Sequence, residues 1–160
     1  MIKIYTIGVY NSTEDEFFGK LVDNDIDLFC DIRQRRGVRG SQYKFVNSNY
    51  LQNKLKEMGI PYMYIKALAP TSEIRNKQKQ ADKAKGETKR KRLVLGDVFK
   101  FEYSCQILDN YDMQKLATEL SNLGVNNVVF FCVEEKASAC HRSLVAHQLN
   151  NILNTNIIDL

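Results

Sequence analysis

The chain has 160 residues, a length that most simply forms one domain with a substantial hydrophobic core. Its composition is typical of a globular protein, and no apolar run is long enough to span a membrane, so we expect no membrane-spanning helix. No signal-peptide pattern opens the chain and the four cysteines are scattered. We therefore expect a cytoplasmic protein with free thiols and no disulfide framework.

The net charge of +4 is unevenly distributed along the chain. Residues 66–92 contain ten Lys and Arg residues against three Asp and Glu residues, which leaves the rest of the chain mildly acidic. Within this stretch, residues 70–92 lack apolar periodicity and are predicted to form a basic helix or lid inserted in the domain. We expect the basic side chains from Lys77 to Arg92 to be solvated. Such a segment is typical of a surface helix, or of a site for an anionic partner such as a nucleic acid.

The first half of the chain shows alternating strand and helix patterns. They are a strand at 2–7, a helix at 12–24, a strand at 26–33, a helix at 49–59 and a strand at 60–68. Gly8 predicts a turn after the first strand, and Thr13 with Glu16 fits a capping box for the first helix. Residues 34–45 are predicted to be a loop rich in arginine and glycine.

The second half continues in the same way. Residues 93–108 fit both the alternating pattern of a strand and the apolar spacing of a helix, and they slightly favour a helix. A helix is predicted at 112–124, with Asp112 as its cap. A strand follows at 126–134, then a helix at 138–153 with Ser138 as candidate cap. Residues 156–160 complete the pattern as a short last strand. The alternation predicts an α/β fold with three layers (α/β/α) and a mostly parallel, Rossmann-like sheet.

Ligands of parallel sheets bind beyond the carboxyl ends of the strands. Gly8 and several polar residues lie at these strand ends and at the start of the last helix, so we expect one cleft there. They are Thr6, Gly8, Asp31, Arg33, Cys132, Glu134, Cys140, His141 and Arg142.

Six motifs together resemble the DUF488 family. They are TIGVYN at 6–11, DIR at 31–33, SQYKF at 41–45, GIPYMYI at 59–65, CVE at 132–134 and CHR at 140–142. The resemblance implies a three-layer α/β fold and a connection to nucleotides or nucleic acids, and it adds Asn11 to the substrate-binding candidates. Val9 stands where the family often has histidine, and LAPTSEIR at 68–75 replaces the usual L-G-G.

Glu134 and Asp31 are the candidate catalytic carboxylates, because acidic groups at strand ends can act as acid, base or nucleophile. Each can equally form an ion pair with Arg33 or Arg142. These two arginines, with Thr6, Gly8 and Asn11, are the predicted phosphate- or substrate-binding residues. In the same arginine-rich loop, Tyr43 could stack on a base, whereas Phe45 is expected to fill the core.

Cys140 and His141 are the other catalytic candidates, since a thiolate is stabilised near a helix N-terminus beside basic groups. Cys132 is expected to be buried. We predict no metal site and no cofactor, because a structural zinc site usually needs two ligand pairs and adjacent Cys140 and His141 would leave a helix in different directions.

These observations favour nucleotide or nucleic-acid processing by glycosidic or other hydrolytic chemistry, such as that of an N-glycosidase-like hydrolase. Two alternatives stay open. One is a binding module for nucleotides or nucleic acids without catalysis, and the other is a thiol-dependent enzyme that uses Cys140. No oligomeric state is predicted.

Overall fold

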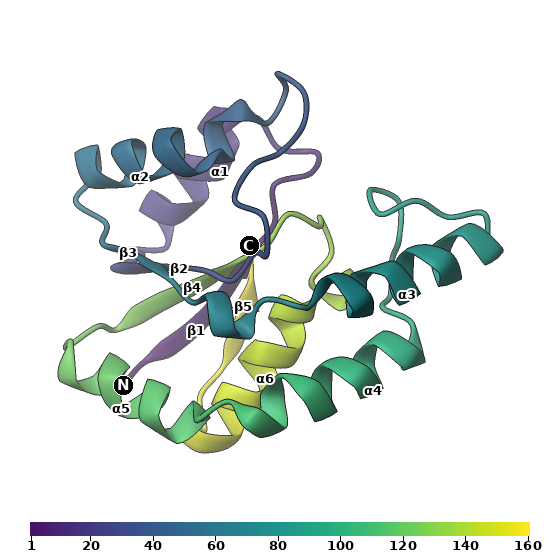
Figure 1. The fold of residues 1–160 in the computed structure, drawn as a ribbon. Coiled ribbons are helices and arrows are strands. Elements are labelled where there is room, and N and C mark those ends of the chain that lie inside the picture. The colour runs from purple at the N-terminus through teal and green to yellow at the C-terminus, as the bar shows by residue number, and fades with distance from the viewer.

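The computed structural model covers residues 1–160 and contains five parallel strands with helices on both faces of the sheet (Figure 1). The strands are β1 (Lys3–Ile7), β2 (Leu28–Asp31), β3 (Tyr62–Tyr64), β4 (Asn127–Phe131) and β5 (Ile157–Asp159). Their order in the sheet is β3-β2-β4-β1-β5. The predicted three-layer α/β fold is therefore confirmed, and the sheet is parallel throughout.

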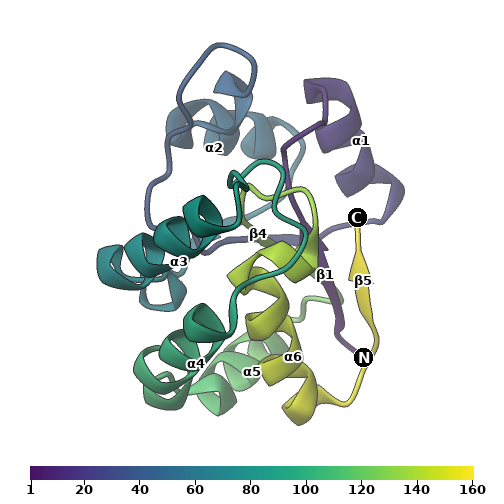
Figure 2. The same cartoon turned by 90° about the vertical axis from the view of Figure 1, so that its right-hand side faces the viewer.

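The helices divide between the two faces of the sheet. They are α1 (Glu14–Asp23), α2 (Ser48–Glu57), α3 (Ser72–Ala84), α4 (Asp97–Gln106), α5 (Met113–Asn122) and α6 (His141–Leu153). Helices α1 and α2 cover one face, and α3 to α6 lie on the other, as both views show (Figures 1 and 2). None of them is both long and apolar enough to cross a membrane.

The alternation of side chains along the strands creates one core on each face. On β4, Val128 and Phe130 pack with the α4–α6 side, whereas Val129 and Phe131 pack with α1 and α2. Phe45 lies in this second core, as expected. Strands buried on both faces read as continuous apolar runs, which is why this pattern was visible in the sequence.

Helix caps explain several of the observed boundaries. The Thr13–Glu16 capping box is present at α1, and the Asp112 side chain accepts a hydrogen bond from the backbone N–H of Lys115 at α5. The ambiguous segment 93–108 contains helix α4, as the sequence slightly favoured.

Short 3-10 helices were not predicted from the sequence. They lie at Lys44–Val46, Lys66–Leu68, Leu108–Asn110 and Ala137–Ala139. The last of these corrects the predicted start of α6: Ser138 belongs to the 3-10 turn, and its hydroxyl donates to the carbonyl of Leu93. Cys140 is the residue at the N-cap of α6.

Candidate functional site

A cavity of about 510 Å³ lies at the carboxyl ends of β2 and β4. The chain leaves β2 toward α2 on one face and leaves β4 toward α6 on the other, so the two connections diverge at this point of the sheet. In its charged side chains, the wall of the cavity is mainly cationic. It contains Arg33, Arg35, Arg39, Arg75, Lys79, Lys89 and Arg92, together with the carboxylates Asp82 and Glu134. Such a wall suits an anionic ligand.

Arg33 is fixed in this wall by Asp31, which ends β2. The guanidinium donates from Nε to Oδ1 of Asp31 (2.9 Å) and from Nη2 to Oδ2 (2.7 Å). The ring of Phe131 packs against one face of the guanidinium, with its centroid 4.6 Å from the central carbon. The third nitrogen, Nη1, is buried and has no hydrogen-bond partner. Arg33 is thus held in place while keeping one donor uncommitted.

Asp31 has no direct place in the wall, because its oxygens are used inside the protein. Besides Arg33, it accepts a hydrogen bond from the hydroxyl of Tyr62 at 2.8 Å. Burial and the Asp31 carboxylate raise the pKa of Tyr62 to about 12, so this hydroxyl keeps its proton and remains a donor. Asp31 was considered either as a catalytic carboxylate or as the partner of an arginine in an ion pair. The structure contains the ion pair, with Arg33.

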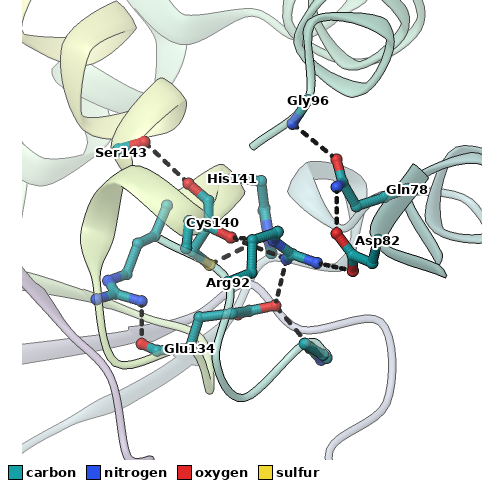
Figure 3. A network of polar contacts seen from close by, with 11 residues as sticks. Gln78, Asp82, Arg92, Gly96, Glu134, Cys140, His141 and Ser143 are labelled. Atoms are coloured by element: carbon teal, nitrogen blue, oxygen red, sulfur yellow. Dashed lines mark hydrogen bonds and ion pairs between the residues drawn. The ribbon is translucent and has the colours of Figure 1, made fainter. Parts of the chain in front are cut away.

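Arg92 joins the basic segment to the β4 end of the cavity (Figure 3). Its Nη1 donates to Oδ2 of Asp82 (2.7 Å), and its Nε and Nη2 donate to the carbonyl of Ala139 (3.2 and 2.8 Å). Asp82 in turn accepts from the amide of Gln78. The expectation that basic residues up to Arg92 are solvated is wrong for Arg92, whose side chain is only 5% exposed.

Glu134 is the carboxylate at the base of this network. Its Oε1 lies 3.4 Å from Nη2 of Arg92 and 3.4 Å from Nζ of Lys89, whereas its Oε2 is buried without a hydrogen-bond partner. Burial opposes ionisation, but the ammonium of Lys89 and the nearby Cys140 side chain together lower the pKa of Glu134 to about 2. The group is therefore a carboxylate at neutral pH and cannot serve as a proton donor there.

Cys132, Cys140 and His141 form a buried cluster beside Glu134. Their ligand atoms all lie within 4.8 Å of one another, and Sγ of Cys140 is 3.6 Å from Nδ1 of His141. Nε2 of His141 lies 2.9 Å from the carbonyl oxygen of Ile32. Contact with Cys140, together with burial, raises the pKa of Cys132 well above its usual value. Cys132 and His141 line the cavity, whereas Cys140 lies behind them and is fully buried.

Arg142 supports the loop after β4 from inside the protein. It is 1% exposed, and it donates to the carbonyls of Glu134 (2.6 Å) and Glu135 (3.0 Å) and to Oγ1 of Thr6 (3.2 Å). Gly8 packs against the same loop so closely that an added Cβ would lie 1.9 Å from the Glu134 carbonyl oxygen. Thr6, Gly8 and Arg142 therefore hold the loop and do not line the cavity.

Asn11 also lies outside the cavity. It has a positive φ of 63°, its backbone N–H donates to the hydroxyl of Tyr43, and its side-chain amide donates to Glu135. Tyr43 is buried, with 3% of its surface exposed, so it presents no open face on which a base could stack. Of the predicted site residues, the structure brings Arg33, Glu134 and His141 together in the cavity wall, with Asp31 and Cys140 directly behind them.

Sequence reasoning missed the residues that the basic segment contributes. Asp82 and Gln78 lie on the buried side of α3 together with Ile74. Their spacing of four residues marks one helix face, but two of the three side chains are polar, so the face did not read as an apolar stripe. A search for polar residues at helical spacing could have found this face, whereas nothing around Arg92 distinguishes it from its basic neighbours.

Comparison with known proteins identifies the family. The family model described as "Domain of unknown function DUF488" matches residues 13–149 of the chain. No match was found among the curated proteins or among the solved structures. Since the matched region covers most of the chain, the resemblance noted from the motifs is confirmed, and the protein belongs to the DUF488 family.

Proposed function

We propose that the protein binds a nucleotide or a nucleic-acid segment in the cationic cavity and hydrolyses a glycosidic bond of that ligand beside Glu134. The observation that carries the proposal is the composition of the wall, which contains seven cationic side chains and the Glu134 carboxylate, two of these cations (Lys89 and Arg92) lying 3.4 Å from Glu134. Cations of this number suit phosphate groups, and the carboxylate supplies a group able to act in a reaction.

Arg33 is the proposed principal phosphate ligand. Its rotamer is fixed by Asp31 and Phe131, so little conformational entropy would be lost when a phosphate binds. Its buried Nη1 has no hydrogen-bond partner, and a phosphate oxygen that reached it after a small movement of the cavity wall would accept its hydrogen bond. Asp31 is a positioning residue in this account. The exposed Arg35, Arg39 and Lys79 would attract the remaining phosphates of a longer ligand.

Glu134 is the proposed reactive group. Hydrolysis of a glycosidic bond places a water hydroxyl on the anomeric carbon and a proton on the departing base. In its ionised form Glu134 would orient the attacking water and stabilise the positive charge that develops on the sugar, while the proton of the water passes to solvent and the departing base takes its proton from solvent. Arg92 and Lys89 keep this carboxylate in position.

The thiol-dependent alternative has one observation in its favour, the 3.6 Å contact between Sγ of Cys140 and Nδ1 of His141. Full burial of Cys140 weighs against it, because a substrate in the cavity would not reach the sulfur. The other alternative, binding without catalysis, uses the same cationic wall and differs only in whether Glu134 acts.

The test is a search for released base. The protein would be incubated with ribo- and deoxyribonucleoside monophosphates and with short single-stranded oligonucleotides, with and without added divalent metal salts, and free bases would be separated by liquid chromatography. We expect release by the native protein and loss of release in Glu134→Gln with ligand binding retained. Glu135→Gln, a change at the exposed neighbouring carboxylate, is the matched control and should remain active.

Binding without release from any member of the panel would overturn the hydrolytic part and favour the binding module. Absence of binding to every phosphorylated member would overturn the proposal as a whole.

A further inference from the structure

We propose that Cys132, Cys140 and His141 bind one transition-metal ion, for which Zn²⁺ is the best match, in the wall of the cavity. This inference does not depend on the proposed hydrolysis, because it rests on the arrangement of three donor atoms. The two sulfurs and Nδ1 of the imidazole lie within 4.8 Å of one another. In tetrahedral zinc sites, Zn–S bonds of about 2.3 Å and Zn–N bonds of about 2.0–2.1 Å place such donors about 3.5–3.8 Å apart.

The contact between Sγ of Cys140 and Nδ1 of His141, at 3.6 Å, already has this spacing. The third donor, Cys132, needs only a small side-chain adjustment, since no pair of the three atoms exceeds 4.8 Å. All three residues are at most 5% exposed, so the donors are held in a packed surrounding and are not free surface groups.

The orientation of His141 is a second, independent observation. Its Nε2 lies 2.9 Å from the carbonyl oxygen of Ile32, and because a carbonyl can only accept, Nε2 must carry a proton and donate. The neutral imidazole then has its lone pair on Nδ1, the atom that faces the Cys140 sulfur. A histidine that binds a metal through one nitrogen typically donates the other N–H to a carbonyl or carboxylate in this way.

Local structure explains why neighbouring residues converge here. Cys140 and His141 were expected to point apart, as successive residues of a helix do. Cys140 instead has the extended backbone angles φ −138° and ψ 147° of an N-cap, and only His141 is helical. Cys132, directly after β4, then completes a set of ligands that the sequence spacing did not suggest.

The donor set selects the class of ion. Two thiolates and one imidazole suit Zn²⁺ and related transition metals, whereas Mg²⁺ and Ca²⁺ require oxygen ligands. Two thiolates also neutralise a divalent cation, which permits its burial close to Arg92. Three protein ligands leave the fourth tetrahedral position open, as in catalytic zinc sites.

Nearby groups fit such an open position. Cys132 and His141 both line the cavity, which gives the ion an entry path and solvent a route to the fourth position. Glu134 follows Cys132 by two residues, and its buried Oε2 has no hydrogen-bond partner. That oxygen would accept a hydrogen bond from a water bound in the fourth position.

The experiment uses the full chain, stripped of metal with a chelator and fully reduced, and titrates it anaerobically with Co²⁺ followed by optical absorption. We expect saturation at one equivalent, with thiolate-to-cobalt charge-transfer bands in the near ultraviolet and intense visible bands typical of tetrahedral coordination. Zn²⁺ should abolish these bands by displacing Co²⁺, whereas Mg²⁺ should not.

Variants assign the ligands. Cys132→Ser, Cys140→Ser and His141→Gln should each lose the tetrahedral cobalt spectrum. Cys105→Ser and His147→Gln are the matched controls, since both side chains are exposed and lie outside the cluster, and they should keep it. Circular dichroism would establish that each variant is folded.

A second measurement on the unmodified chain covers the case in which a ligand variant does not fold. Zn²⁺ should protect Cys132, which lines the cavity, from alkylation, as read by peptide mass spectrometry, while Cys105 stays reactive. Failure of Co²⁺ to bind at one equivalent to the fully reduced protein would overturn the proposal. So would alkylation of Cys132 at the same rate with and without Zn²⁺.

Discussion

Replacement of Arg92 by methionine tests whether the basic segment is built into the fold. The side chain is 5% exposed and donates to Asp82 and to the carbonyl of Ala139, and it also lies 3.4 Å from Glu134. Methionine preserves much of the apolar stem and removes the charge. Asp82 and Glu134 would then remain as buried carboxylates that have lost their shared cation.

The expected cost follows from that geometry. Removing one partner of a buried ion pair typically destabilises a protein by about 3–5 kcal/mol, because the remaining charge stays desolvated. Lys89 still neutralises part of Glu134, and Gln78 still donates to Asp82, so we expect a value near the lower end, about 3 kcal/mol. Arg92→Lys should not restore full stability, because an ammonium cannot reproduce the forked contacts of a guanidinium.

The measurement is urea unfolding followed by circular dichroism, with Lys91→Met as matched control. Lys91 is the exposed neighbour, and its replacement should change the unfolding free energy by less than about 0.5 kcal/mol. Adding Asp82→Asn to Arg92→Met should cost less than the sum of the two single changes, since the second substitution removes a charge that the first left unpaired. A loss below about 1 kcal/mol in Arg92→Met, or strict additivity in the double variant, would show that Arg92 does not neutralise the two buried carboxylates.

Three further predictions concern the cavity and its support. Gly8→Ala places a methyl group 1.9 Å from a carbonyl oxygen of the loop after β4 and should destabilise the fold by about 1–3 kcal/mol in urea unfolding. Gly19→Ala is the control: Gly19 lies in a helix with no atom within 4 Å of the new Cβ, so the change should stabilise the fold by about 0.5–1 kcal/mol. Asp31→Asn should weaken nucleotide binding in calorimetry, because Asp31 positions Arg33 although it lies outside the cavity wall itself. Unchanged affinity would show that Arg33 does not need this ion pair to bind the nucleotide. If the basic segment contacts a nucleic-acid backbone, replacing the exposed Lys83 and Lys85 by alanine should weaken the salt dependence of binding to single-stranded DNA. The slope of log affinity against log salt concentration, measured by fluorescence anisotropy, should fall in magnitude by about 0.7 for each lost phosphate contact. An unchanged slope would show that these lysines contact only solvent.

Much of the fold could be predicted because its signals are local. The capping box at Thr13 and the cap at Asp112 mark helix starts by contacts only three residues apart in sequence. The apolar run of β4 marks a strand buried on both faces. The start of α6 was predicted at the wrong residue because Ser138 and Cys140 both precede the apolar helical pattern and either could be the N-cap. Ser138 is excluded from this role by its hydrogen bond to the carbonyl of Leu93, a residue distant in sequence.

The composition of the site was less accessible from the sequence because it depends on partners far apart in the chain. Arg92 is buried only because Asp82, Glu134 and the Ala139 carbonyl converge on it, and no pattern of neighbouring residues encodes that. Arg142 shows the opposite case. Its place at a helix start suggested a ligand contact, yet the loop after β4 provides carbonyls that use its donors.

The most direct test of the cationic cavity is a calorimetric comparison of a nucleoside monophosphate with its nucleoside, using the native protein, Arg33→Met and Lys91→Met. Our prediction is one site for the monophosphate and at least about tenfold weaker binding of the nucleoside. Arg33→Met should lose about 1.5–3 kcal/mol of binding free energy, the range of a hydrogen bond to a charged group, and Lys91→Met should lose none. Equal affinity for the monophosphate and the nucleoside, or undiminished monophosphate binding in Arg33→Met, would contradict it.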